Sequence, residues 1–154
     1  MKWALAMNEI DGYKVGFETP YLSVAWNINQ EGDDAELRHK LVARWGGAKI
    51  TVWPGYVFDG ASIPRAAWRL VGHPWGDYAP AACIHDILYD TELWPRVDAD
   101  KCLRDLIATL PVNPFRRWLI YQAVRLAGGP TWDKHTDQSR AIARSYLDVE
   151  YDYA

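Results

Sequence analysis

The chain has 154 residues, of which 49% are hydrophobic and 24% charged, and its formal net charge is −3. These values predict one soluble domain spanning residues 1–154, and they give no electrostatic basis for binding nucleic acid. No apolar run is long enough for a signal peptide or a transmembrane helix, so we expect synthesis in the cytoplasm and no membrane span. The nine tryptophans are unusual, and they suit either an aromatic core or a protein interface.

The first sixty residues are typical of β-structure. Two alternating segments rich in β-branched and aromatic residues, 13–17 and 21–28, predict strands that Thr19-Pro20 separates. Two shorter segments, 50–53 and 56–58, predict further strands on either side of a Pro-Gly turn.

The segment between these strands is ambiguous. Leu37, Leu41, Val42 and Trp45 recur at helical spacing, which favours a helix over about 37–45 that Gly46-Gly47 would end. The alternation of apolar residues in the same segment also fits a strand.

The second half is predicted to be helical. Ser62 is a candidate N-cap and Pro64 suits the first turn of a short helix. Pro80 begins a helix through residues 81–90, and Asp98 is a candidate cap for the next. The expected fold is α+β, with a β-rich part at 1–60, a helical part at 61–148 containing helices at 115–127 and 136–147, and a tail at 149–154.

The segment 81–90 places polar side chains inside an apolar helix. His85 and Tyr89 share one helix face, and Asp86 points about a quarter turn to the side. Buried polar groups are costly unless they are hydrogen-bonded, so they need partners elsewhere in the chain. The best candidates are Asp100 and the loop 59–62, whereas His39 and His135 have no evident partner. By itself the segment also fits a satisfied core histidine without any chemical role.

Two motifs at a fixed distance carry a family resemblance. The first is PGYVFDGASIPR at 54–65, and the second is AACIHDILY at 81–89, followed by Ala99-Asp100. They resemble the phage and prophage family known as domain of unknown function 1353, whose pattern is PxGFxxDxASIPR, then AAxxHDxLY, then an Ala-Asp pair. The similarity covers about residues 50–129, with Tyr56 where the family has Phe. It implies a phage or prophage gene and no established activity.

A weaker resemblance suggests chemistry. His-Asp-x-x-Tyr on one helix and Asp on the next is similar to the active-site helices of phospholipase A2. That resemblance implies that His85 is the general base, that Tyr89 and Asp100 orient its imidazole, and that Asp86 binds Ca²⁺. Further oxygen ligands would come from the loop 57–62, which offers Asp59 and Gly60 but lacks the glycine-rich calcium loop of the secreted enzymes. The structural turn beside this site is expected to contain Ser62, Pro64 and Arg65.

The two cysteines give an internal check on the helix pair. If antiparallel helices bring His85 against Asp100, then Cys83 and Cys102 both point away from the seam between them. A disulfide between these cysteines and the His85–Asp100 contact therefore exclude each other. We predict the contact, with free and buried thiols.

Two functions remain open from the sequence. The first is a virion- or tail-associated hydrolase that acts on the bacterial envelope through His85, Asp86 and Asp100. The second is a structural or interaction protein of the phage particle, in which the same cluster is a hydrogen-bond network that stabilises the fold. The expected partners are other phage structural proteins or components of the bacterial envelope. An open cleft at His85 favours the first function, and a buried His85 favours the second.

Overall fold

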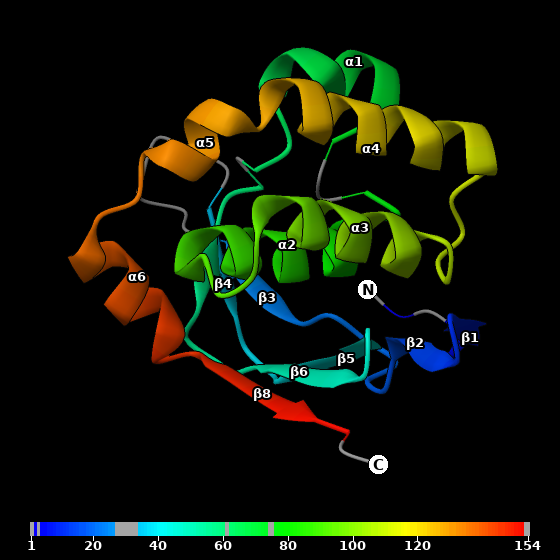
Figure 1. Cartoon of the computed structure of the whole chain (residues 1–154), viewed down its shortest axis with the longest axis horizontal. Helices are drawn as coiled ribbons and strands as arrows, with labels where there is room; N and C mark the ends of the chain where they lie inside the picture. The colour runs from blue at the N-terminus through cyan, green and yellow to red at the C-terminus, as the bar shows by residue number, and fades with distance from the viewer. Residues whose placement is uncertain (1, 3, 27–33, 61, 74–75, 153–154) are drawn as a thin grey trace.

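A computed structural model of the chain describes residues 2, 4–26, 34–60, 62–73 and 76–152. Its elements form three layers, with a five-stranded sheet on one side, the helices α2 and α3 in the middle, and α1, α4 and α5 on the other side (Figure 1). The five-stranded antiparallel sheet has the order β1 (Met7–Ile10), β2 (Tyr13–Phe17), β5 (Leu41–Trp45), β6 (Ala48–Val52) and β8 (Leu147–Tyr151). The helices are η1 (Arg65–Ala67), α1 (Trp68–Val71), α2 (Ala79–Thr91), α3 (Arg96–Ile107), α4 (Pro114–Ala127), α5 (Gly129–Asp133) and α6 (Asp137–Arg144).

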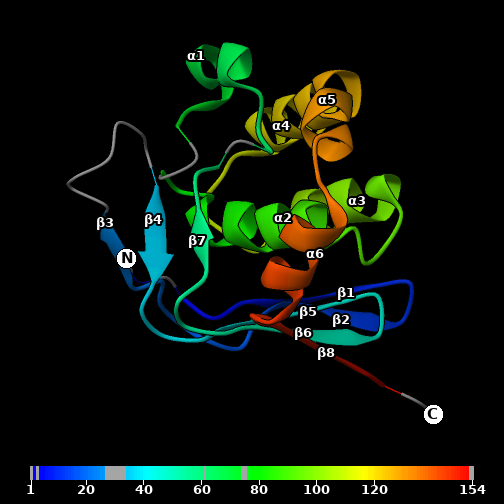
Figure 2. The same cartoon turned by 90° about the vertical axis from the view of Figure 1, so that its left-hand side faces the viewer.

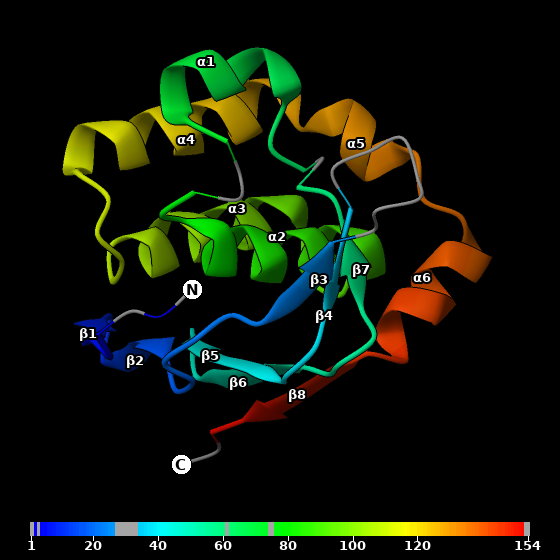
Figure 3. The ribbon, with the colours of Figure 1, turned by 180° about the vertical axis from the view of Figure 1, so that it is seen from behind.

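A second, smaller sheet stands upright beside α2 (Figures 2 and 3). It has three antiparallel strands in the order β3 (Val24–Trp26), β4 (Ala35–Leu37) and β7 (Val57–Phe58). Since β7 leads directly into the loop 59–62, this sheet fixes where that loop meets α2. The β-rich first part and the helical second part confirm the predicted α+β fold.

The helix expected over about 37–45 is wrong. This segment forms the end of β4 and the whole of β5, as the alternative pattern allowed. Both Val42 (4% exposed) and its neighbours in β5 are buried, so apolar residues on both faces of the strand imitate helical spacing. Gly46 and Gly47, at φ +59° and +77°, form the turn of the β5–β6 hairpin instead of ending a helix.

The tail expected at 149–154 is also wrong over its described part. Residues 147–151 form β8, which pairs along the whole of β6 from Val52↔Leu147 to Ala48↔Tyr151. The strand carries little apolar periodicity because it lies at the edge of the sheet, where the side chains of Asp148 and Glu150 are exposed.

Part of the predicted strand 21–28 forms β3, while residues 27–28 lie outside the part of the chain that the structure describes.

Helix α2 is the centre of the molecule. It lies between the large sheet and α4, next to α3, which returns antiparallel to it after residues 92–95 (Figure 1). Of its thirteen residues, only Asp90 is not buried. A helix covered on every side is apolar all round, and any polar group within it must find its partner inside the protein.

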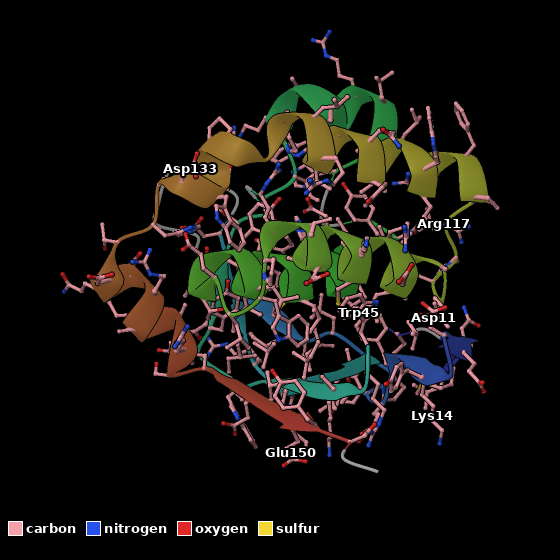
Figure 4. All side chains as sticks on the ribbon, viewed as in Figure 1. Asp11, Lys14, Trp45, Arg117, Asp133 and Glu150 are labelled. Carbon is pink, nitrogen blue, oxygen red and sulfur yellow. The ribbon has the colours of Figure 1, made fainter. Side chains whose placement is uncertain are left out.

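The sheet and the helical layer are also tied by a polar contact. Trp45 projects from β5 toward α3 (Figure 4), where its indole N–H donates to Asp105 Oδ2 at 2.8 Å.

Two residues that were predicted to be helix N-caps have other roles. Pro95 stands at the N-cap of α3, so Asp98 lies in its first turn, and Ser62 lies before Pro64, which is the N-cap of η1.

Candidate functional site: a buried Ser–His–Asp network

The predicted contact between α2 and α3 is confirmed. His85 Nε2 lies 2.7 Å from Asp100 Oδ1, and the Tyr89 hydroxyl donates to the same oxygen at 2.7 Å. Arg125 of α4 donates from Nη1 to Asp100 Oδ2 at 2.7 Å. Cys83 and Cys102 are free and buried, as predicted from the same helix geometry.

The second ring nitrogen of His85 faces the loop after β7. His85 Nδ1 lies 2.9 Å from Ser62 Oγ, and the Ser62 hydroxyl is hydrogen-bonded to Asp86 Oδ1. The Gly60 N–H donates to Asp86 Oδ2 at 2.8 Å. Gly60 has φ +71°, a conformation that side chains with a Cβ rarely adopt, and it lets the loop direct this N–H at α2. Asp86 therefore ties the loop to the central helix.

Burial changes the acid–base properties of all three ionisable groups. It lowers the pKa of His85, and the hydrogen bond to Asp100, which acts in the opposite direction, does not offset it. Burial raises the pKa of Asp86 well above its ordinary value, and the nearby Asp90 adds to the effect. For Asp100, burial alone would raise the pKa, but the donors His85, Tyr89 and Arg125 outweigh it and hold the pKa below its ordinary value.

Two proton arrangements of the network contain the same number of protons. In one, protonated Asp86 donates to Ser62, the Ser62 hydroxyl donates to His85 Nδ1, and Nε2–H donates to Asp100. In the other, Asp86 is ionised and accepts from Ser62, and a doubly protonated His85 donates to both Ser62 and Asp100. The low pKa of His85 and the high pKa of Asp86 favour the first arrangement. In that arrangement the network contains one ionised carboxylate, Asp100, next to Arg125.

This proton count predicts how stability depends on pH. The folded pair His85–Asp86 holds one proton, whereas the unfolded pair loses its last proton as the pH rises through about 6.5, the ordinary pKa of histidine. Because the folded state then binds the extra proton, the free energy of unfolding should fall by about 1.4 kcal/mol per pH unit above that value, until the network loses its proton.

Asp86→Asn should remove that alkaline slope, because an amide cannot hold the proton. The low pKa of His85 should then give stability that is full above pH ~6.5 and is lost as the pH falls below it. The measurement is urea unfolding of both proteins from about pH 5 to about pH 9, a range that spans the ordinary pKa of histidine. Parallel pH profiles for wild type and variant would contradict the shared proton.

The network is closed to solvent. His85 and Asp100 are 0% exposed, and Ser62 and Asp86 are each 3% exposed. Three clefts on the surface, with volumes of about 420, 450 and 440 Å³, are lined by other residues. A substrate therefore meets none of the network's atoms in this arrangement.

The expected calcium ligands are used for other contacts. Both oxygens of Asp86 are engaged in hydrogen bonds, and the Gly60 carbonyl accepts from the Ile63 N–H at 3.0 Å. Asp59 is exposed and lines the cleft between β7 and α6. Within the part of the chain that the structure describes, no three His, Cys, Asp or Glu side chains form a group that could hold a metal ion. The residues as arranged do not fit Ca²⁺, and calcium binding stays a prediction from the phospholipase A2 resemblance.

The predicted turn residues lie together but have different contacts. Ser62 belongs to the network, while the Pro64 carbonyl accepts from the Ala67 N–H at 2.9 Å and begins η1. The Arg65 guanidinium lies over the Trp68 ring, 5.1 Å from its centroid, and is exposed. Only Ser62 of the three thus reaches His85.

A second polar cluster was missed from the sequence. The Tyr56 hydroxyl donates to Asp90 Oδ2 at 2.5 Å, and His135 Nε2 lies 3.0 Å from Asp90 Oδ1. His135 Nδ1 lies 3.0 Å from the Trp132 carbonyl, so the histidine that had no evident partner is fixed on both sides. The only sequence signal was Tyr56, which adds a hydroxyl where the resembled family has Phe.

These observations define a small α+β protein built around a buried Ser–His–Asp network. The chain belongs to the family described as protein of unknown function DUF1353, whose model matches residues 35–124. The match begins at β4 and ends in α4, so it includes every side chain of the network except Arg125. Neither a curated protein nor a solved structure matches the chain.

Proposed function

We propose that this chain is a structural or interaction protein of a phage or prophage particle, and that its His85–Asp86–Asp100 cluster stabilises the fold without catalysing a reaction. The observation that carries the proposal is the complete burial of His85 and Asp100, with both imidazole nitrogens already engaged. The phage context rests on the motifs at 54–65 and 81–89. The described helices include none that is long and apolar enough to cross a membrane.

The network joins four parts of the chain. Asp100 of α3 receives donors from α2 and α4, and Asp86 of α2 is hydrogen-bonded to Gly60 and Ser62 of the loop after β7. Each of these contacts joins residues distant in sequence, so the cluster fixes how the helices and the small sheet are placed. Satisfied polar networks of this kind rigidify a core and specify a single arrangement.

A hydrolase is the second candidate, because one observation favours it. Ser62, His85 and Asp100 follow each other in the order of a serine nucleophile, a base and an orienting carboxylate, with 2.9 Å and 2.7 Å between the bonded atoms. For that chemistry the loop 59–62 would have to move away from α2, since Ser62 is 3% exposed.

The two candidates predict different results in one set of samples. We expect no turnover of a fluorogenic phospholipid or a fluorogenic short-chain ester, with or without calcium, and no saturable calcium heat in titration calorimetry. In a double-mutant cycle, His85→Gln and Asp100→Asn should show a coupling free energy of about 1–3 kcal/mol in urea unfolding. Turnover that disappears in both Ser62→Ala and His85→Gln, while the variants remain folded, would replace this proposal with the hydrolase.

A further inference from the structure

Helix α4 carries apolar side chains on the face that points away from the protein. Phe115, Trp118 and Leu126 fall on a single stripe at 100° per residue, and they are 68%, 54% and 84% exposed. The opposite face of the helix is buried, with Ile120 and Val124 both at 0% exposed. A helix that is apolar on both faces is normally covered on both, and within the part of the chain that the structure describes the outer stripe stays exposed.

The neighbouring helix α1 extends this surface. Leu70 is 73% exposed, while the next residue, Val71, is buried and accepts a hydrogen bond from Arg116 of α4 through its carbonyl. Helices α1 and α4 lie side by side and form the outermost layer in two perpendicular views (Figures 1 and 2). We call Leu70, Phe115, Trp118 and Leu126 the outer apolar face.

The charged residues of η1, α1 and α4 are of one sign, whereas α5 in the same layer ends with Asp133. Although the chain has a net charge of −3, η1, α1 and α4 contain five arginines and no acidic residue. Arg116 is bound to Val71 and Asp77, Arg125 is bound to Asp100, and the Arg65 guanidinium lies over the Trp68 ring. Arg65 and Arg69 are exposed on the η1–α1 segment, and Arg117 lies near the beginning of α4 (Figure 4).

The composition of the layer favours a lipid surface as its partner. The side chains of the outer apolar face are exposed, and they lie on helices that also carry exposed arginines. Leu, Phe and Trp that project beside arginines can insert into the headgroup and acyl boundary of a bilayer, which needs no shaped counterpart. Anionic lipids add attraction for each arginine near the surface.

We propose that the outer apolar face and the arginines of η1 and α1 bind the surface of an anionic lipid bilayer. The side chains of the outer apolar face insert between headgroups, and Arg65 and Arg69 contact lipid phosphates. This proposal is independent of the role assigned to the buried network, because no residue of that network lies on the face.

The test is co-sedimentation of the full chain with vesicles of phosphatidylcholine alone, or of phosphatidylcholine mixed with phosphatidylglycerol. We expect binding to the mixed vesicles that weakens as salt is added, because screening shortens the reach of the arginines. Leu70→Ser/Leu126→Ser should lower the partition at least about tenfold, since each leucine loses apolar burial. Arg65→Gln/Arg69→Gln should lower it about thirtyfold.

Matched controls lie elsewhere on the surface. Leu5→Ser removes a leucine that is 56% exposed outside this layer, and Lys14→Gln/Lys101→Gln removes two exposed charges, of which Lys14 lies on the sheet side of the molecule (Figure 4). Both should leave binding unchanged, and all variants should keep the wild-type melting temperature because the replaced side chains are exposed. Absence of wild-type binding to the mixed vesicles, or equal loss in the controls, overturns the proposal. Self-association of the wild type in sedimentation velocity that Leu70→Ser/Leu126→Ser abolishes, without vesicle binding, also overturns it and makes the face a protein interface.

Discussion

Asp100→Ala is expected to lower the free energy of unfolding by about 3–5 kcal/mol, because it leaves two buried donors without an acceptor, each at about 1–3 kcal/mol, and also removes the carboxylate next to Arg125. The variant deprives Arg125 of its carboxylate, and it leaves His85 Nε2 and the Tyr89 hydroxyl without an acceptor. Urea unfolding at neutral pH measures the change. Effects of this size are a large fraction of the stability of a domain of this length.

The matched control is Asp133→Ala. Asp133 ends α5 and points to solvent (Figure 4), so its removal should change the free energy of unfolding by no more than about 0.5 kcal/mol. Asp100→Asn, which keeps the volume but loses the charge, should fall between the two. If Asp100→Ala unfolds at the same urea concentration as the control, the network does not stabilise the fold and the proposed function fails with it.

Asp86→Ala is expected to cost about 2–4 kcal/mol, because each buried polar group that loses its hydrogen-bond partner costs about 1–3 kcal/mol. The groups affected are the Gly60 N–H and the Ser62 hydroxyl. The loop 59–62 would lose its attachment to α2, and backbone amides in this loop should exchange with solvent faster.

Asp86→Asn should cost no more than about 1 kcal/mol near pH 6, because it repeats the hydrogen bonds of a protonated carboxyl group. The amide oxygen accepts from Gly60, and the amide NH₂ donates to Ser62, whose hydroxyl remains a donor to His85. If Asp86 were ionised in the folded protein, the Ser62 hydroxyl would be a donor to it, and the amide NH₂ of the Asp86→Asn variant would face that donor. Asp86→Asn would then lower the free energy of unfolding as much as Asp86→Ala. Comparing the two variants by urea unfolding therefore identifies which proton arrangement is present.

Local sequence was enough to locate the network but not to describe it. A histidine, an aspartate and a tyrosine in an apolar helix require partners inside the protein, and Asp100 was one of the two best candidates for that role. Ser62 was expected to cap a helix, yet its hydroxyl lies between Asp86 and His85. Arg125 and His135 were not found, because they come from segments 25 and 45 residues away from their partners Asp100 and Asp90.

The errors in the fold have the same origin. Leu41, Val42 and Ala43 are all buried, and a strand with buried residues on both faces carries no period that separates it from a helix. Residues 147–151 become a strand only because β6 offers its edge, since their own sequence has little apolar alternation.

The sequence by itself determined the α+β class, the family motifs and the need for a buried polar cluster, because these depend on local periodicity and on residue type. The tertiary structure alone decided that the cluster is closed to solvent, that Asp86 tethers the loop 59–62, and that an apolar, arginine-bearing layer faces outward. Burial and proton sharing are properties of surroundings, and surroundings come from segments that are distant in the chain.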